Sequence, residues 1–410
     1  MGKLFYSQND DKSGYFHPFC SAYCTTLYIE DINHIRRKGA PISRAAVAKE
    51  LGLTKATVSA IVQALLEDGL LKEVGSEDTS YGRKPILLQL CEDAGYAISV
   101  DVGVETLSAI RTNLIGKRTR LIQHETPADP EEMLTEILRL IRKLKEEAEA
   151  EQKKKTEETP EKNYGLVGVA LGIHGAVKDN VITFAPYYPL SGWDLAGRLE
   201  AELGVPVYLE NEANLSVIGE DSFVYDYPIL ANISVHTGVG LGVIVEDELY
   251  TGFNGNAGEI GHTIVEVDGR PCPCGNKGCL EQYVSERVLL REFAERKGLP
   301  SVDMDTFFEY HRAKDPDAKY ILDQFVRYMS VCVNNVLNSF NPDIVIINSL
   351  FVVNSPGLIK RIEQSLSSRV NHYVEIVPSG LQDASILLGG ISVAVRKFLG
   401  INHLHFDLWG

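Results

Sequence analysis

The sequence of 410 residues lacks long apolar runs, and none reaches the roughly 18 residues that a membrane-spanning helix needs. It has no basic segment followed by an apolar one near its start, so we expect no export signal and a soluble, cytoplasmic protein without a membrane partner. Apolar residues make up 44% and charged residues 23%, which excludes a disordered, collagen-like or disulfide-stapled chain. No short repeat indicates a solenoid. The length predicts two or three domains.

Positive charge is scarce, because the formal net charge is −16. The shortage is uneven. Residues 1–90 hold 11 Lys+Arg and 10 Asp+Glu, whereas residues 91–410 hold 29 and 46. All of the excess acid therefore lies outside the first segment, and a near-neutral module on an acidic body can still bind DNA through one face.

Cysteine occurs seven times, an odd number that does not suit a complete set of disulfides. Three of the seven crowd together at Cys272, Cys274 and Cys279, shortly after His262. Three thiolates and one imidazole are a standard tetrahedral set for structural Zn²⁺, which leaves no open position for catalysis. The sequence therefore predicts zinc at these four residues, with three adventitious cysteines as the alternative.

The first 90 residues follow the order of a winged helix-turn-helix. Helices are expected at 24–37, 44–51 and 55–66, and strands at 70–74 and 85–90. Ser43 and Thr54 are suitable N-caps for the second and third helices, and Gly52 opens the tight turn between them. A three-helix protein-interaction module is the alternative.

The third helix of this segment is the expected recognition helix, since side chains near its start would reach base edges. The wing tip adds a basic pair suited to a narrow minor groove. We predict DNA contacts from Ser43, Arg44, Thr54, Lys55, Thr57, Ser59, Arg83 and Lys84.

From residue 95 onward, strands and helices alternate, which predicts an α/β body. The β-rich runs are 96–102, 108–112, 165–171, 207–209, 229–236, 241–246 and 344–347, and the helical patterns include 130–148, 193–203 and 317–337. The charge run at 143–163 is expected to be a solvated helix end and loop. We expect residues 1–23 and 143–163 to be ordered only in some states.

Polar side chains flank the predicted zinc loop in a pattern typical of a polyol site. Glu259 and His262 precede the loop, and Glu281 follows it. Carboxylates accept paired sugar hydroxyls, and a metal-bound imidazole can donate from its other nitrogen. Asn211 and Glu212 follow a strand end and complete the set. Each residue alone suits a surface or capping role, so the prediction depends on their convergence.

Glycine-containing segments at 101–105, 236–242 and 388–390 are candidates for holding a phosphate through backbone N–H groups. A tight hairpin explains the first two equally well. The third is expected to open a helix near the C-terminus.

These motifs together resemble the ROK family, which groups repressors, open reading frames and sugar kinases. The resemblance covers residues about 24 to 400 and rests on the sequence Glu259-x-Gly-His262 and on the cysteine loop followed by Glu281. It implies an N-terminal winged helix and an actin-like (ribonuclease H-like), two-lobed ATPase-type body with a sugar cleft. We expect the DNA-binding domain at 1–90 and the body at 91–410. The resemblance divides the body into a smaller lobe at about 91–212 plus the C-terminal helix, and a larger lobe at about 213–385.

Three positions depart from the pattern of the family's kinases. Glu212 stands where the resemblance implies an aspartate base, Glu105 ends a turn that normally ends in Thr or Ser, and His236 replaces the first glycine of a Gly-Thr-Gly turn. These changes argue against phosphoryl transfer, so we expect a degenerate kinase body with no catalytic residues. His174 replaces a proline beside the cleft, and it is a further candidate for sugar contact or a core histidine.

The family's xylose-responsive repressors are similar to this sequence at residues 82–85, 94–104, 210–214 and 341–347. The resemblance implies a homodimer, or a higher oligomer, that binds operator DNA and releases it when a monosaccharide inducer enters the cleft. The resemblance implies xylose as the inducer. As a separate hypothesis, Glu212 fills the volume that a hexose's hydroxymethyl group would occupy and so selects a pentose by exclusion. An active sugar kinase with a DNA-binding appendage and a sensor controlled by a protein partner are the alternatives.

Overall fold

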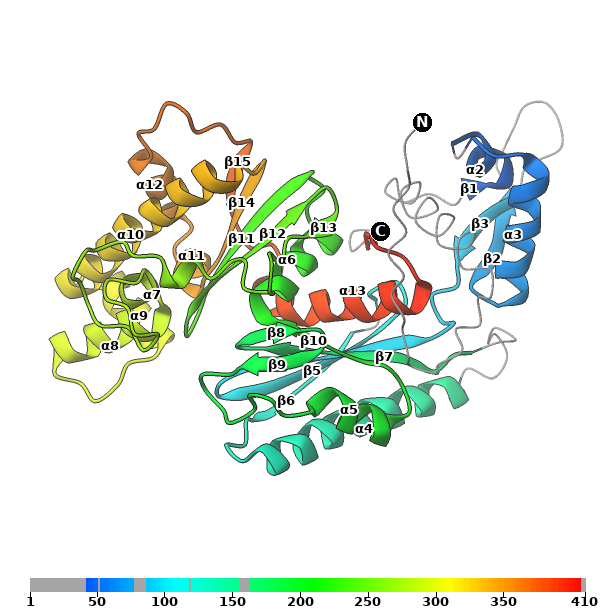
Figure 1. The fold of residues 1–410 in the computed structure, drawn as a ribbon, viewed down its shortest axis with the longest axis horizontal. Helices are drawn as coiled ribbons and strands as arrows, with labels where there is room; N and C mark the ends of the chain where they lie inside the picture. The colour runs from blue at the N-terminus through cyan, green and yellow to red at the C-terminus, as the bar shows by residue number, and fades with distance from the viewer. Residues whose placement is uncertain (1–41, 51, 77–85, 118, 155–162, 407–410) are drawn as a thin grey trace.

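The computed structural model describes residues 42–50, 52–76, 86–117, 119–154 and 163–406. Figure 1 shows three parts along the longest axis: a small winged domain, a body built on one sheet and a second body built on another. Within the described residues, no helix is long and apolar enough to cross a membrane. The expected helix at 24–37 and the wing tip with Arg83 and Lys84 lie outside the described residues.

In the part of the winged domain that the structure describes, there are two helices and three strands. They are β1 (Ile42–Ser43), α2 (Arg44–Glu50), α3 (Lys55–Glu67), β2 (Leu71–Ser76) and β3 (Ile86–Leu90), with antiparallel sheet order β1-β3-β2. The backbone N–H of Ala46 donates to Ser43 Oγ at 3.3 Å, and that of Thr57 donates to Thr54 Oγ1 at 3.2 Å. These are the N-cap bonds that the sequence predicted. The two described helices and both strands are confirmed to within two residues.

The first body is a five-stranded sheet in the order β10-β7-β4-β5-β6. Its strands are β4 (Tyr96–Val102), β5 (Thr106–Asn113), β6 (Arg120–Glu125), β7 (Leu166–Ile173) and β10 (Val207–Asn211). Strands β4, β7 and β10 are parallel, so their carboxyl ends share one edge. Helices α4 (Pro130–Lys154) and α5 (Leu195–Leu203) pack on one face, and α13 (Ser385–Leu399) packs on the other. A short hairpin, β8 (Ala176–Lys178) and β9 (Val181–Phe184), follows β7.

The second body is a sheet in the order β13-β12-β11-β14-β15. Its strands are β11 (Ile229–Val235), β12 (Val239–Val245), β13 (Glu248–Leu249), β14 (Ile344–Asn348) and β15 (Glu375–Pro378). Helix α6 (Glu212–Phe223) covers one face. The other face carries η1 (Ile260–His262), α7 (Glu281–Val284), α8 (Glu286–Lys297), α9 (Met304–Arg312), α10 (Pro316–Phe340), α11 (Leu350–Asn354) and α12 (Gly357–Ser365), while η2 (Gln382–Ala384) precedes α13.

The two bodies meet where α6 crosses α13 (Figure 1). A Cβ built on Gly219 would lie 2.2 Å from the carbonyl oxygen of Ser385, and one built on Gly389 would lie 1.8 Å from that of Leu215. The helices therefore touch backbone to backbone, which only glycine permits. The prediction that residues 388–390 open a helix is wrong, because α13 begins at Ser385 and the glycine pair lies inside it.

Several other elements differ from the sequence prediction. Strand β6 was missed because most of its side chains are exposed, which removes the alternation that marks a strand. Strands β8, β9, β13 and β15 are only two to four residues long and were missed as well. The helix expected at 130–148 continues to Lys154, so part of the charge run is helical.

Candidate functional site

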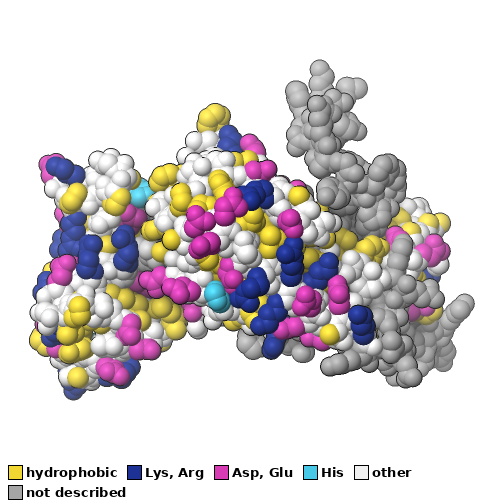
Figure 2. All heavy atoms as spheres, turned by 90° about the horizontal axis from the view of Figure 1, so that it is seen from below, with side chains coloured by type: hydrophobic (Ala, Val, Ile, Leu, Met, Phe, Trp, Pro, Cys, Tyr) yellow, Lys and Arg dark blue, Asp and Glu magenta, His cyan; other side chains and the backbone are white. Residues whose placement is uncertain are grey.

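The candidate site lies where the carboxyl edge of the first sheet faces the second body. Asp101 lies near the end of β4, His174 follows β7, and Glu212 follows β10 as the first residue of α6. Ligands bind at the carboxyl ends of parallel strands in open α/β sheets. Figure 2 shows acidic side chains gathered where the two bodies meet, on the face seen from below.

An ion pair occupies the centre of this edge. The Nε2 atom of His174 lies 3.0 Å from Oδ1 of Asp101, and both side chains are largely buried, at 14% and 18% exposure. Burial lowers the pKa of His174, but the charges of Asp101 and Glu212 outweigh burial and raise it to about 9. The imidazole is therefore positively charged at neutral pH.

Glu212 contributes a carboxylate with an unsatisfied oxygen. Within the described residues, its buried Oε2 has no hydrogen-bond partner. Burial raises the pKa of Glu212, and the positive charges of His174 and His236 partly oppose that shift. A buried acceptor without a donor is costly, and a ligand hydroxyl would remove this cost.

His236 extends the site onto the second sheet, since it follows β11. Its Nδ1 lies 3.9 Å from Oε2 of Glu286. Glu286 is fixed by the hydroxyl of Ser349, which donates to Oε1 at 2.9 Å, and by the backbone N–H of Leu350 at 2.6 Å. Burial lowers the pKa of His236, but Glu286 outweighs burial and raises it.

A second group of predicted sugar-binding residues lies around the cysteine loop at 272–279. His262 Nε2 lies 3.8 Å from Oε2 of Glu259, and His262 Nδ1 lies 4.0 Å from Oε1 of Glu281. A Cβ built on Gly238 would lie 3.6 Å from the hydroxyl of Tyr187 and 3.8 Å from Oε2 of Glu281, so the loop reaches the turn between β11 and β12. Three of the predicted sugar-binding residues therefore converge here.

The four predicted zinc ligands also converge. One ligand atom from each of His262, Cys272, Cys274 and Cys279 lies within 4.8 Å of the others. The Sγ atoms of Cys274 and Cys279 are 3.7 Å apart, and Cys272 Sγ lies 3.6 Å from His262 Nδ1. Tetrahedral zinc with Zn–S bonds of about 2.3 Å places its sulfurs about 3.8 Å apart. The donor set and its spacing therefore fit zinc, and Nδ1 is the nitrogen that would bind it.

Asn211 lies beside the cleft but is occupied with local structure. Its Oδ1 accepts from the backbone N–H groups of Ala213 at 2.8 Å and Asn214 at 3.2 Å, which makes it the N-cap of α6. Its Nδ2 donates to the carbonyl of Gly175 at 2.9 Å. The capping role that the sequence offered as the plain alternative is therefore present.

Sequence reasoning missed Asp101, Tyr187 and Glu286 as members of this site. A signal existed for Asp101, because it ends a strand in the same parallel set as the strands before His174 and Glu212. No comparable signal marked Tyr187 or Glu286, which reach the cleft only through tertiary packing.

Two glycine segments that were candidates for phosphate binding have packing roles. A Cβ built on Gly103 would lie 2.6 Å from the carbonyl oxygen of Thr106, so this turn is a tight hairpin. Gly240 and Gly242 lie against the start of α6, where a Cβ would lie 2.7 Å from Ala213 Cβ and 2.5 Å from its carbonyl oxygen, respectively.

A profile described as the ROK family matches residues 97–397, nearly the whole of both bodies. The chain belongs to the ROK family. A second profile, winged helix-turn-helix DNA-binding, matches residues 32–72.

Relatives of this ROK protein match over most of its length. It is 32% identical over 377 residues to the xylose repressor of Bacillus spizizenii, covering 89% of this chain and 94% of the relative. It is 26% identical over 341 residues to the N-acetylglucosamine repressor of Escherichia coli, covering 80% and 82%. Among solved structures, a ROK family transcriptional regulator, a homologue of the E. coli MLC protein, has a TM-score of 0.76 at 23% identity and covers 92% of this chain and 96% of that one. The structural likeness supports the fold.

Four of the predicted DNA-binding side chains of this ROK protein lie at the start of α3. Thr54, Lys55, Thr57 and Ser59 are all exposed, and the hydroxyls of Thr54 and Thr57 are 2.8 Å apart. Arg44 pairs with Glu73 at 3.0 Å, so its charge is partly engaged within the domain. Ser43 acts as a helix cap.

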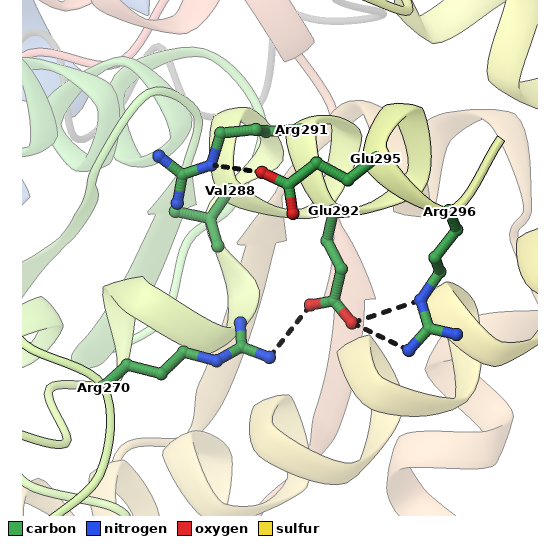
Figure 3. A pocket seen from close by; sticks show the side chains of 6 residues that line it. All are labelled: Arg270, Val288, Arg291, Glu292, Glu295 and Arg296. Carbon is green, nitrogen blue, oxygen red and sulfur yellow. Dashed lines mark hydrogen bonds and ion pairs between the residues drawn. The ribbon is translucent and has the colours of Figure 1, made fainter. Parts of the chain in front are cut away.

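A separate pocket lies between α8 and Arg270 (Figure 3). Its charged side chains pair with one another. Glu292 binds Arg270 at 2.9 Å and Arg296 at 3.2 Å, and Arg291 lies 4.0 Å from Glu295. The internal pairing leaves little unbalanced charge for a ligand, so we do not include this pocket in the site.

Proposed function

We propose that this protein is a sugar-responsive transcriptional repressor that binds operator DNA in the cytoplasm as a homodimer and is released by xylose. The observation that carries the proposal is the presence of two sites in one chain. An exposed recognition helix begins at Lys55, and a group of carboxylates lies in the body, with Glu212, Glu259 and Glu281 close enough for their charges to interact. The names of relatives that match over most of the chain support xylose as the inducer.

The DNA contacts of this proposal come from the start of α3. Thr54, Lys55, Thr57 and Ser59 would reach base edges, while Ser43 and Arg44 would contact the backbone and Arg83 and Lys84 the minor groove. A dimer would place two such helices one helical turn apart on a palindromic operator.

The sugar contacts come from both bodies. Glu259, His262 and Glu281 would bind hydroxyls from the second body, and Glu212 and His174 from the edge of the first. Asn211 would hold the start of α6 in place as its N-cap, or donate the remaining N–H of its side-chain amide to a sugar hydroxyl. A ligand that bridges the bodies favours one relative arrangement of them, and it can shift DNA affinity only by its differential affinity for the two arrangements.

We propose no enzymatic activity. Two features support this. The charges of His174 and His236 act on Glu212, and the exposed carboxylate of Glu105 would repel a phosphate at the turn after β4. ATP consumption in the presence of xylose or glucose would show instead that the kinase chemistry is retained.

Zinc at His262, Cys272, Cys274 and Cys279 would have a structural role in this proposal. When bound, the ion cross-links the loop and fixes the orientation of the His262 ring. The loop in turn holds Glu259 and Glu281 at their places around the sugar.

Operator binding tests the function directly. We expect xylose, but not glucose, to weaken binding to DNA from the protein's own gene neighbourhood by about 5–150-fold, the usual range of allosteric coupling. Fluorescence anisotropy with labelled operator measures this. Tight binding that no sugar changes would contradict the sugar-responsive part of the proposal, and absence of operator binding would contradict the repressor itself.

Loss of the zinc ligand Cys274 tests the role of the loop. Cys274 is exposed, so Cys274→Ser changes the ligand set without opening the core. We expect operator affinity to stay within about twofold and the xylose concentration needed for release to rise about 10–100-fold, as for groups that orient a site. The same anisotropy titration measures both quantities, with Ser367→Ala as a control at an exposed position. Loss of operator affinity before the xylose response would contradict the assigned role.

A further inference from the structure

A second cluster of metal-binding side chains lies in the C-terminal segment, outside the cleft. After α13, His403 and His405 alternate with Leu404 and Phe406, whose side chains are 1% and 4% exposed. In an extended segment, side chains two residues apart share a face. The apolar pair therefore faces the core, and both imidazoles face the opposite side.

The two imidazoles converge with a buried carboxylate of α6. One ligand atom from each of Asp221, His403 and His405 lies within 4.8 Å of the others. The Nε2 atoms of the two rings face each other, and His403 Nδ1 lies 3.7 Å from Asp221 Oδ2. Ligand atoms about 2.0–2.2 Å from one ion lie about 3.3–3.6 Å apart in a tetrahedral site. An imidazole offers only one of its nitrogens to an ion, and with one atom from each residue the three groups lie within 4.8 Å, so side-chain rotations would have to close the remaining distance.

Two further carboxylates stand at the solvent side of this cluster. Asp247 Oδ1 lies 3.6 Å from His403 Nε2, and Asp226 Oδ1 lies 3.8 Å from His405 Nε2. Both aspartates are about half exposed, at 52% and 56%, whereas Asp221 is 1% exposed. An ion would therefore have an entry path on one side and a buried anchor on the other.

The charges around the cluster favour a divalent cation. Three aspartates face the cluster. Arg396 supplies a single positive charge, and it lies close enough that the charges of Asp221 and Asp247 affect its pKa. With neutral imidazoles, this leaves an excess of two negative charges. Imidazole nitrogens combined with carboxylate oxygens suit zinc, cobalt and similar transition-metal ions better than calcium or magnesium.

We propose that Asp221, His403 and His405 bind a divalent transition-metal ion, with Asp226 and Asp247 as additional carboxylates. The ion would fasten the C-terminal segment to α6 and to the turn after β12.

This position connects the ion to the winged domain. Phe406 stacks on Phe223 of α6 with ring centroids 4.3 Å apart, and its backbone N–H donates to the carbonyl of Ser222 at 2.7 Å. The same buried cluster contains Leu404, Phe406 and core residues of α2, α3 and β3. A metal that holds the C-terminal segment would therefore restrict the movement of the buried cluster that the DNA-binding domain shares with this segment.

Metal content of the untagged full chain tests the proposal. We expect two Zn²⁺ per chain in the wild type and one in the double variant His403→Asn/His405→Asn, measured by elemental analysis after dialysis. His372, which is exposed and lies outside both clusters, provides the control His372→Asn, which should keep two.

Replacing Zn²⁺ with Co²⁺ shows by absorption spectroscopy which of the two clusters holds a metal ion. Co²⁺ bound by cysteine thiolates has a sulfur-to-metal charge-transfer absorption, which a site made of imidazoles and carboxylates cannot give. We expect Cys274→Ser to weaken that absorption while one Co²⁺ remains, and the histidine double variant to keep the absorption and lose one Co²⁺.

The number of Zn²⁺ ions per wild-type chain tests the proposal even if the double variant does not fold. The single variant Asp247→Asn, at the exposed edge of the cluster, should lower Zn²⁺ affinity. A single metal per wild-type chain, with the full thiolate absorption, would overturn the proposal. The histidines would then contact the aspartates without a metal between them.

Discussion

Replacing Gly389 with alanine is expected to destabilise the fold, although alanine stabilises most helices. The built Cβ would lie 1.8 Å from the carbonyl oxygen of Leu215 and 3.1 Å from the backbone nitrogen of Gly219. Neither atom belongs to a side chain that can rotate away, so α6 and α13 must separate. Such overpacking costs about 1–3 kcal/mol or more, which exceeds the gain of up to about 1 kcal/mol from helix propensity.

The thermal midpoint measures this effect, and it should fall by about 1–2 °C for each kcal/mol lost, because the unfolding entropy grows with chain length. A matched control is Gly357→Ala at the start of α12, where a Cβ would have no atom within 4 Å. The control should be neutral or slightly stabilising. Equal midpoints for Gly389→Ala and the wild type would mean that α6 and α13 can move apart without loss of stability. Close backbone contact between the two helices would then not be required.

The crossing matters for function because it joins the two bodies. Helix α6 packs on β11 and β12 of the second sheet, and α13 packs on β4 and β7 of the first. Hydrogen bonds between serines tie the helices together, with Ser216 and Ser385 hydroxyls 2.8 Å apart and Ser222 and Ser392 hydroxyls 2.7 Å apart. Any relative movement of the bodies on sugar binding passes through this contact.

The fold was predictable where local chemistry determines local structure. Thr54 caps α3, Asp315 caps α10 and Gly204 ends α5 in the left-handed region, and residues of these types mark helix ends in any sequence. The clustering of His262 with Cys272, Cys274 and Cys279 was predictable for a similar reason, since the three cysteines lie within one short loop. Residue type and spacing carry that information without any knowledge of the tertiary structure.

The remaining features depend on contacts between distant segments. Gly389 and Gly390 look like a helix start, because glycine is unfavourable inside a helix unless another backbone lies against it. The Asp101–His174 pair joins residues 73 positions apart. The cluster of Asp221, His403 and His405 combines a helix, whose own pattern is buried and featureless, with the segment after the last helix. None of these contacts between distant residues produces a periodic pattern in the sequence, so pattern analysis cannot predict them.

Shortening Glu212 to aspartate is expected to reduce the preference for a pentose over a hexose. The carboxylate lies beside Gly240, where a built Cβ would be 3.4 Å from Oε1, and its other oxygen is buried. Removing one methylene creates space about the size of part of a hydroxymethyl group. One methylene in a pocket changes discrimination by about 1–3 kcal/mol, which is about 10–200-fold.

The ratio of the glucose and xylose concentrations that half-release operator DNA measures this preference. For Glu212→Asp we expect that ratio to fall at least tenfold. Glu210→Asp is the matched control, because Glu210 is also largely buried but its Oε1 accepts from Asn211 N at 2.8 Å and Asn214 Nδ2 at 2.9 Å. That variant can weaken both sugars together but should leave their ratio unchanged. An unchanged ratio for Glu212→Asp would mean that discrimination lies elsewhere, and His174 would then be the next candidate, because it is charged and pairs with Asp101 at the same edge of the sheet.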